Sequence, residues 1–163
     1  MRQGKVSFLA FDQHPRSREN ETIKIHAYSD GGARGNPGPA AFANIFCNED
    51  GRIVKESSSY IGNATNNEAE YKGLIAALVQ ADAMGADEIL ITMDSEVVVK
   101  QMTGEYHVRA KNLIPLAEEA KRLRSRFKSF SIACVKRDDP MISRTDELVN
   151  YELDQRELLR KLR

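Results

Sequence analysis

The stretch TNNEAEYKGLIAALVQADAMG, residues 65–85, decides the fold because the hydrophobic pattern of the chain changes its period there. Three segments before it are rich in residues that favour strands. Inside the stretch, apolar residues return at helical spacing, at Leu74, Ala77, Leu78 and Ala81. Gly85 stands where such a helix would stop. The pattern therefore predicts a set of strands followed by a helix that can pack on them.

The segments on either side of this helix extend the pattern to an α/β fold. Before it, strands are predicted over residues 22–29, 40–48 and 52–61. After it, strands are predicted over residues 88–94 and 129–137, and helices over 95–102, 112–127 and 143–162. This order predicts one five-stranded mixed sheet, three antiparallel strands and then two parallel ones, flanked by helices. Residues 23–163 are expected to form the domain, and residues 1–22 an extension of unknown role.

The composition is that of an ordinary globular domain. With 163 residues, 41% hydrophobic and 29% charged, the chain can bury a core of its own. No apolar run approaches the roughly 20 residues that span a bilayer, and the N-terminus has no secretory signal, so no membrane association is expected. Cys47 and Cys134 lie in strand-like apolar runs, which indicates buried, reduced thiols in a cytoplasmic protein without a zinc site.

Charge is balanced overall but uneven along the chain. The formal net charge is zero, which argues against a protein that holds nucleic acid by bulk charge. The second part of the chain carries a basic run, KRLRSRFK, at residues 121–128. This run could contact a polyanion, although a solvated helix face is the simpler interpretation.

Two acidic residues stand out in the first half of the chain. Glu70 shares the apolar face of the predicted helix, where a carboxylate is costly unless it is paired or binds a metal. Thr65 and Glu68 already form a capping box, so Glu70 is not needed as a cap. Asp30 ends a predicted strand and precedes two glycines, which fits either a turn or a functional carboxylate.

Two more acidic residues follow later. Asp94 comes directly after the strand predicted to be most buried, and ligands of open α/β sheets gather beyond the carboxyl ends of strands. It could also cap the next helix, a role that Ser95 can fill. Asp146 closes the sequence SRTD, which is itself a capping-box pattern, so it could serve only to begin the last helix.

Together the four acids suggest a site for hard divalent cations. Magnesium prefers a few carboxylates together with water and substrate phosphate. Two such ions about 4 Å apart can stabilise both the attacking and the leaving oxygen of a phosphoryl displacement. The chain offers no convincing Ser/His/Asp or Cys/His arrangement, and no G-K-[ST] follows the glycines, which excludes a P-loop enzyme.

Five motifs, in order and spacing, resemble type 1 ribonuclease H. They are YSDGGARGNPGPAA (28–41), TNNEAEYKGLIAAL (65–78), ITMDSEVVVKQM (91–102), NLIPL (112–116) and DELVNYELD (146–154). The resemblance runs from about Ile23 to about Leu159 and implies the ribonuclease H-like fold.

The resemblance also implies a reaction and its residues. The reaction is endonucleolytic hydrolysis of the RNA strand of an RNA/DNA hybrid, giving 5′-phosphate and 3′-hydroxyl ends. The family's catalytic, metal-binding carboxylates fall on Asp30, Glu70, Asp94 and Asp146, with two Mg²⁺ ions, or Mn²⁺ as a substitute. Contacts to the hybrid fall on Gly31, Gly32, Asn36, Thr65, Asn66 and Asn67. A catalytically silent hybrid-binding module on the same fold is the alternative, and no obligate protein partner is expected.

The sequence departs from the better-known bacterial members of the family near the predicted site. The segment before NLIPL is too short for the basic protrusion that helps relatives hold the hybrid, so the run at residues 121–128 is expected to compensate. The loop before the last helix lacks the histidine that many relatives use for product release. Arg137, Arg144 or Arg163 could replace it. Ile142 stands where the family tends to have asparagine.

Overall fold

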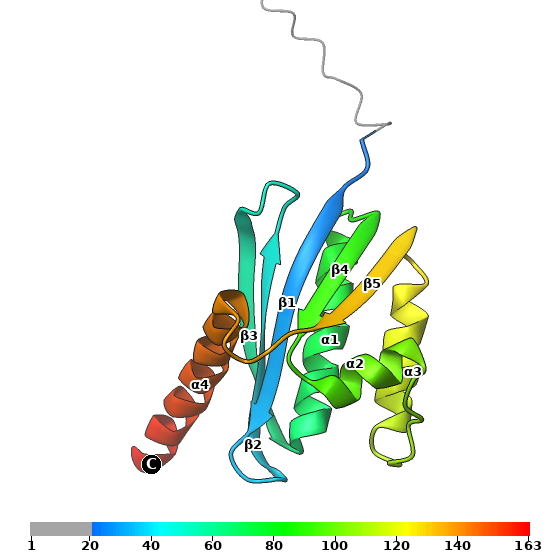
Figure 1. Cartoon of the computed structure of the whole chain (residues 1–163). Coiled ribbons are helices and arrows are strands. Elements are labelled where there is room, and N and C mark those ends of the chain that lie inside the picture. The colour runs from blue at the N-terminus through cyan, green and yellow to red at the C-terminus, as the bar shows by residue number, and fades with distance from the viewer. Residues whose placement is uncertain (1–20) are drawn as a thin grey trace, which may run out of the picture.

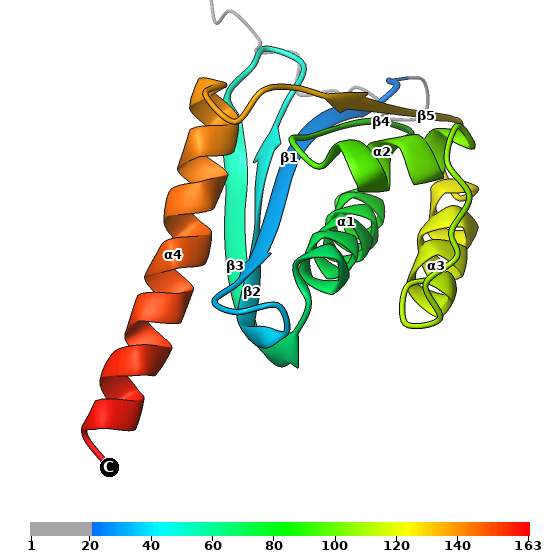
Figure 2. The same ribbon diagram turned by 60° about the horizontal axis from the view of Figure 1, so that its bottom comes forward.

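Residues 21–163, which the computed structural model describes, fold around one five-stranded sheet with helices on both faces. The elements are β1 (Lys24–Ala33), β2 (Gly38–Cys47), β3 (Ile53–Ala64), α1 (Asn66–Ala83), β4 (Glu88–Met93), α2 (Glu96–Thr103), α3 (Ile114–Arg124), β5 (Ser129–Cys134) and α4 (Pro140–Lys161). The strand order β3-β2-β1-β4-β5 confirms the predicted mixed sheet, with β4 and β5 parallel to β1. Figures 1 and 2 show α1, α2 and α3 on one face and α4 against the other.

Strand β1 runs through the glycine-rich motif rather than ending before it. Asp30 pairs with Ala43 of β2, and the antiparallel ladder continues through both following glycines to Ala33. The prediction that Asp30 ends a strand is therefore wrong. The physical reason is the close approach of α1: a Cβ atom on Gly31 would lie 2.4 Å from the backbone carbonyl carbon of Ala69. The glycine lets the helix contact the strand backbone instead of turning the chain.

Helix α1 forms as its sequence predicts. Thr65 accepts a hydrogen bond from the backbone N–H of Glu68 at 3.1 Å, and the Glu68 carboxylate accepts one from the backbone N–H of Thr65 at 3.1 Å. This confirms the capping box. All four residues predicted for the apolar face are fully buried between the helix and the sheet. Tyr71 is also buried, and its hydroxyl donates to Gln101 of α2 at 2.6 Å.

Helix α2 has its own cap, which leaves Asp94 without that task. Ser95 Oγ accepts a hydrogen bond from the backbone N–H of Val98 at 3.3 Å and is the N-cap. The helix ends at Gly104, whose φ of 86° places it in the left-handed region that glycine adopts without strain. Ser95, and not Asp94, therefore caps α2, which leaves the functional role as the remaining interpretation of Asp94.

Helix α4 begins three residues earlier than predicted. Asp139 is its N-cap and accepts hydrogen bonds from the backbone N–H groups of Met141 and Ile142, and Pro140 is the first helical residue. The sequence SRTD therefore lies inside the helix, and Asp146 is not part of a cap. The helix packs against β1, β2 and β3 through four buried residues, Ile142, Thr145, Val149 and Leu153.

The two cysteines differ in exposure. Cys47 is buried, as predicted, but Cys134 is exposed, so the prediction of two buried thiols is wrong for Cys134. The reason is that β5 is an edge strand and pairs only with β4. In the described part of the chain no helix has the length and apolarity needed to cross a membrane. The predicted extension, residues 1–22, lies outside the described residues except for its last two.

The two glycines after Asp30 provide a matched test of the packing between β1 and α1. We expect Gly31→Ala to lower the free energy of unfolding by about 1–3 kcal/mol, because the added methyl group would overlap the backbone of α1. Gly32→Ala is the control, since its Cβ would meet only Val149 Cγ1 at 3.8 Å. Urea unfolding of both variants measures the difference. Equal stability of the two variants would contradict this packing.

Candidate functional site

Three of the four predicted acids meet at one end of the central strands. Asp30 lies in β1, Glu70 in α1, and Asp94 directly after β4. Carboxylate oxygens of the three lie within 4.8 Å of one another. The strand register explains part of this arrangement. Tyr28 of β1 pairs with Thr92 of the parallel β4, so two residues further along the neighbouring strands reach Asp30 and Asp94 side by side.

Asp146 joins this group from the opposite face of the sheet. It comes from α4, is half-buried, and lies close enough to Asp30 for its charge to raise the pKa of that carboxyl. Asn150, one turn further along the helix, donates from Nδ2 to the backbone oxygen of Asp146 at 3.1 Å and to its Oδ2 at 3.4 Å. The structure therefore gathers three acids tightly and places the fourth beside Asp30.

The acids are held in an environment that disfavours their charge. Asp30 and Glu70 are only 6% and 8% exposed. Burial, followed by the charges of Asp94 and Asp146, raises the pKa of Asp30 to about 7. Burial, followed by the charges of Asp30 and Asp94, raises the pKa of Glu70 well above its ordinary value. Clustered like charges in a desolvated place have this effect in general.

This arrangement fits a hard divalent cation. Glu70 Oε2 is buried and has no hydrogen-bond partner among the described residues. The cost of burying this oxygen is therefore not offset by a hydrogen bond, and the oxygen is free to bind a cation. Carboxylate oxygens from three separate elements are the donor type that Mg²⁺, Mn²⁺ or Ca²⁺ prefers. A bound cation would replace mutual repulsion among the carboxylates with attraction to a shared positive charge.

The predicted nucleic-acid contacts surround the start of α1, next to the acids. Asn36 Oδ1 accepts a hydrogen bond from the backbone N–H of Asn66 at 3.0 Å, and Asn66 Oδ1 accepts one from the backbone N–H of Ala33 at 2.9 Å. These bonds fasten the β1–β2 turn to the helix. Thr65 caps α1, Asn67 is half-buried in its first turn, and Gly31 and Gly32 lie in β1. Their roles toward a nucleic acid stay predictions.

The structure separates the three arginines considered as substitutes for a loop histidine. Arg137 Nε lies 3.4 Å from Asp94 Oδ2. Arg144 instead forms an ion pair with Glu56 on β3. Arg163 follows the end of α4, roughly 25 Å along the helix from Asp146 at 1.5 Å per residue. Arg137 is therefore the arginine of the three that reaches the acids.

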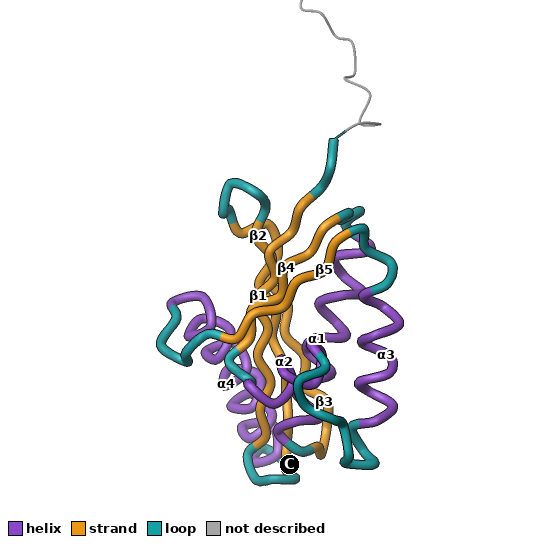
Figure 3. Tube along the Cα trace, turned by 45° about the vertical axis from the view of Figure 1, so that its right-hand side comes forward, coloured by secondary structure: helices purple, strands orange, loops and turns teal. Residues whose placement is uncertain are grey.

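The basic run at residues 121–128 lies away from the acids. Arg126 pairs with Asp82 at 3.0 Å, and Lys128 pairs with Asp87 at 3.5 Å, just before β4 begins. These pairs place the end of the run at the amino ends of β4 and β5, whereas Asp94 follows the carboxyl end of β4. Figure 3 shows α3 on the opposite side of the sheet from α4. This placement does not favour the expectation that the run compensates for the missing protrusion.

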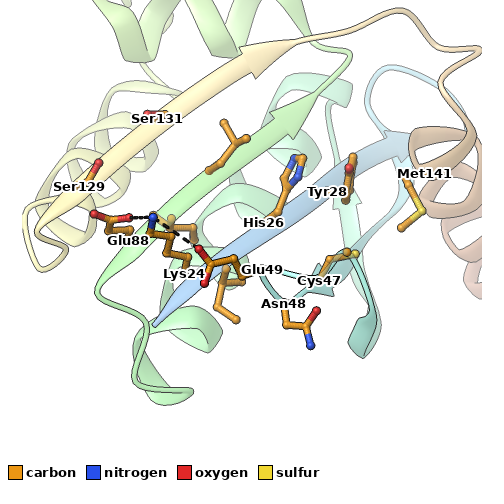
Figure 4. Close-up of a pocket in the computed structure, with 14 residues that line it drawn as sticks. Lys24, His26, Tyr28, Cys47, Asn48, Glu49, Glu88, Ser129, Ser131 and Met141 are labelled. Atoms are coloured by element: carbon orange, nitrogen blue, oxygen red, sulfur yellow. Dashed lines mark ion pairs between the residues drawn. The ribbon is translucent and has the colours of Figure 1, made fainter. Parts of the chain in front are cut away.

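Sequence reasoning missed a hollow of about 340 Å³ on the sheet face that α4 leaves uncovered (Figure 4). The rings of His26 and Tyr28 stack there with centroids 4.2 Å apart, and His26 Nε2 is 2.7 Å from Thr92 Oγ1. The even-numbered residues of β1 share this face with Asp30, which was the available signal. None of the four acids lines the hollow, so its volume does not mark the site.

Comparisons with known proteins agree on one family. A family model described as "Reverse transcriptase-like" matches residues 28–145. Ribonuclease HI of Halobacterium salinarum is 44% identical over 131 residues, and the crystal structure of RNase H1 from that organism covers 81% of this chain and 98% of its own, with a TM-score of 0.77. The N-terminal RNase H domain of a bifunctional Mycobacterium tuberculosis protein is 39% identical, with a TM-score of 0.78, and covers 82% of this chain and 96% of the solved chain.

A third structure adds a ligand to the comparison. LC11-RNase H1, solved in complex with an RNA/DNA hybrid, is 38% identical, with a TM-score of 0.75, and covers 80% of this chain and 97% of its own. Two of the relatives are longer than the matched region. The match spans 65% of the Halobacterium ribonuclease HI and 36% of the bifunctional mycobacterial protein.

The raised pKa of Asp30 predicts a pH-dependent penalty in the metal-free protein. Between pH about 4 and about 7 the folded state holds a proton that the unfolded chain releases, so stability falls as pH rises through this window. We therefore expect Asp30→Asn to be more stable than the wild type by about 1–3 kcal/mol at pH 8. At pH 4 the two should be equal. Urea unfolding with a chelator present measures both.

Glu147→Gln is the control for this experiment, because Glu147 is an exposed acid beside Asp146. It should change stability little at either pH. A wild-type protein as stable as Asp30→Asn at pH 8 would show that the carboxylates do not repel one another as the structure indicates.

Proposed function

Because the chain belongs to the type 1 ribonuclease H family, we propose that it hydrolyses the RNA strand of RNA/DNA hybrids endonucleolytically, leaving 5′-phosphate and 3′-hydroxyl ends. The observation that carries the proposal is the group of three carboxylates within 4.8 Å of one another, in which one buried oxygen has no hydrogen-bond partner among residues 21–163. The hybrid bound to LC11-RNase H1 supports the choice of substrate.

We assign the metal ligands to Asp30, Glu70, Asp94 and Asp146. The donor set and the unpaired Glu70 oxygen fit Mg²⁺, and Mn²⁺ would substitute. Two such ions, when bound, would supply Lewis-acid activation of water and stabilisation of the departing 3′ oxygen. The protein's own contribution is to hold the four carboxylates in place before the substrate arrives, from elements fixed by a sheet register, a capped helix and the packing of α4.

The residues around the start of α1 would bind the hybrid. Gly32 leaves the backbone of β1 open to close approach, whereas the space beside Gly31 is taken by α1, so Gly31 would contribute through its own backbone groups. The amides of Asn36, Asn66 and Asn67, together with Thr65, lie around the turn and the helix that border the acids. Recognition of RNA rests on contacts to the 2′-hydroxyl, which DNA lacks. We assign these contacts to this polar group, to the backbone of the two glycines and to the side chain of Glu70.

The reaction itself is tested with a labelled hybrid and purified protein in Mg²⁺ or Mn²⁺. We expect cleavage of the RNA strand alone, and a loss of roughly 10³-fold or more in rate for Asp30→Asn, because removing one ligand costs several kcal/mol of transition-state stabilisation. Asp50→Asn, in the exposed β2–β3 turn, is the control and should keep full activity. Tight binding without cleavage in either metal would establish the silent binding module instead.

Arg137 and Arg144 form a second matched pair. We expect Arg137→Ala to lower kcat roughly tenfold, about 1.4 kcal/mol, because its guanidinium lies beside Asp94. Arg144→Ala should leave kcat unchanged, since that arginine pairs with Glu56 on β3. Steady-state kinetics on a short hybrid measure both. A larger loss of kcat for Arg144→Ala than for Arg137→Ala would contradict the assignment of this role to Arg137.

A further inference from the structure

Arg34 connects the turn beside the catalytic strand to the helix that carries the fourth acid. From the β1–β2 turn its side chain reaches three residues of α4. Nη2 lies 2.6 Å from Asp154 Oδ1 and 3.4 Å from Asn150 Oδ1, and Nη1 lies 3.2 Å from Glu157 Oε2. The three partners are spaced by about one helical turn, so they form one stripe along the helix.

We propose that Arg34 is a positioning residue that holds Asp146 at the metal site by fastening α4 to the β1–β2 turn. The inference rests on the proposed function and assigns Arg34 no contact with the substrate.

The first support is a continuous chain of hydrogen bonds. Arg34 donates to Asn150 Oδ1, and the amide nitrogen of the same asparagine donates to the backbone oxygen and to Oδ2 of Asp146. One orientation of the Asn150 amide satisfies both contacts, because its oxygen accepts and its nitrogen donates. The orientation of the half-buried Asp146 carboxylate is thereby linked to the position of the arginine.

The second support is that the apolar packing of α4 ends well before the helix does. Its buried residues all lie between Ile142 and Leu153, and beyond them Leu158, Leu159 and Leu162 are exposed. Figure 2 shows the helix continuing past the sheet. The contacts of Arg34 begin within the packed part and extend to Glu157, so they add lateral hold where apolar packing ends.

The third support is that the β1–β2 turn, from which Arg34 extends, is itself held in place. The backbone N–H of Arg34 donates to Pro39 across the turn at 2.8 Å, and Asn36 of the same turn accepts from the backbone N–H of Asn66 at the start of α1. The turn thus contacts the helix of Glu70 and directly continues the strand of Asp30. Arg34 adds the helix of Asp146 to this group, so all three elements share one anchor.

The network is exposed, which determines what its loss should change. The side chains of Arg34 and Asp154 are 37% and 64% exposed, and ion pairs of this kind add little to global stability. Removing the arginine should therefore leave the melting temperature nearly unchanged. It should instead loosen the orientation of Asp146, which a metal-binding measurement detects directly.

The test compares Arg34→Ala, Arg34→Lys and Arg156→Ala. Arg156 lies on the same helix and stacks over the Tyr60 ring at 4.4 Å, so its removal alters an α4 contact that is separate from the turn. Mn²⁺ binding to the free protein is measured by calorimetry, and Mg²⁺ activation by hybrid cleavage. We expect Arg34→Ala to weaken Mn²⁺ binding and to raise the Mg²⁺ concentration for half-maximal activity, each roughly fivefold. Arg34→Lys should recover part of both losses, and Arg156→Ala should change neither.

A double-mutant comparison separates this role from its alternatives. In an Asp146→Asn background, Arg34→Ala should have no further effect on Mn²⁺ binding. A full additional effect, or unchanged metal binding in Arg34→Ala, would overturn the proposal. So would a raised KM for hybrid with normal metal binding, which would make Arg34 a phosphate contact. Because the calorimetry needs no substrate, it decides the role of Arg34 even if the wild type fails to cleave hybrid.

Discussion

Repulsion among buried carboxylates is the constraint on which the rest of this structure depends. Three acids whose oxygens lie within 4.8 Å oppose folding when they are ionised, so the scaffold must hold them there at a cost. It does so with rigid parts. Strand β1 is bonded to a neighbour on each side, and α1 is fixed by a capping box and by the contact that Gly31 permits. Strained clusters of this kind are typical of functional sites.

The helices cover the two faces of the sheet unequally (Figure 1). Helices α1, α2 and α3 cover one face and enclose the main apolar core, whereas α4 alone lies on the other and contacts β1, β2 and β3. The side of β4 and β5 that faces away from α1 therefore has no helix over it (Figure 1). Asp94 directly follows β4, one of these two strands.

Local pattern was sufficient for much of the fold and for part of the site. Helical spacing placed Glu70 on the buried face of α1, because a period of 3.6 determines the face of every residue. The position of Asp94 followed from the apolar strand before it. Asp30 was different: glycines after an aspartate indicate a turn, and only the contact of Gly31 with α1, some 40 residues later, shows why the strand continues. The early start of α4 has a local signal, the Asp-Pro pair at residues 139–140, because aspartate favours the N-cap and proline the first helical position. The partners of Arg34 lie more than 100 residues away and have no local signature.

The four acids come from β1, from α1, from the connection after β4 and from α4, and Asp146 belongs to the last element of the chain. No run of the sequence shorter than residues 30–146 contains the complete set. During synthesis, strands β1 to β5 and three helices can leave the ribosome while the carboxylate of α4 is still missing. The four carboxylates can therefore come together only after almost the whole domain has been made, and on the function proposed above a chain still in synthesis would lack one of its metal ligands.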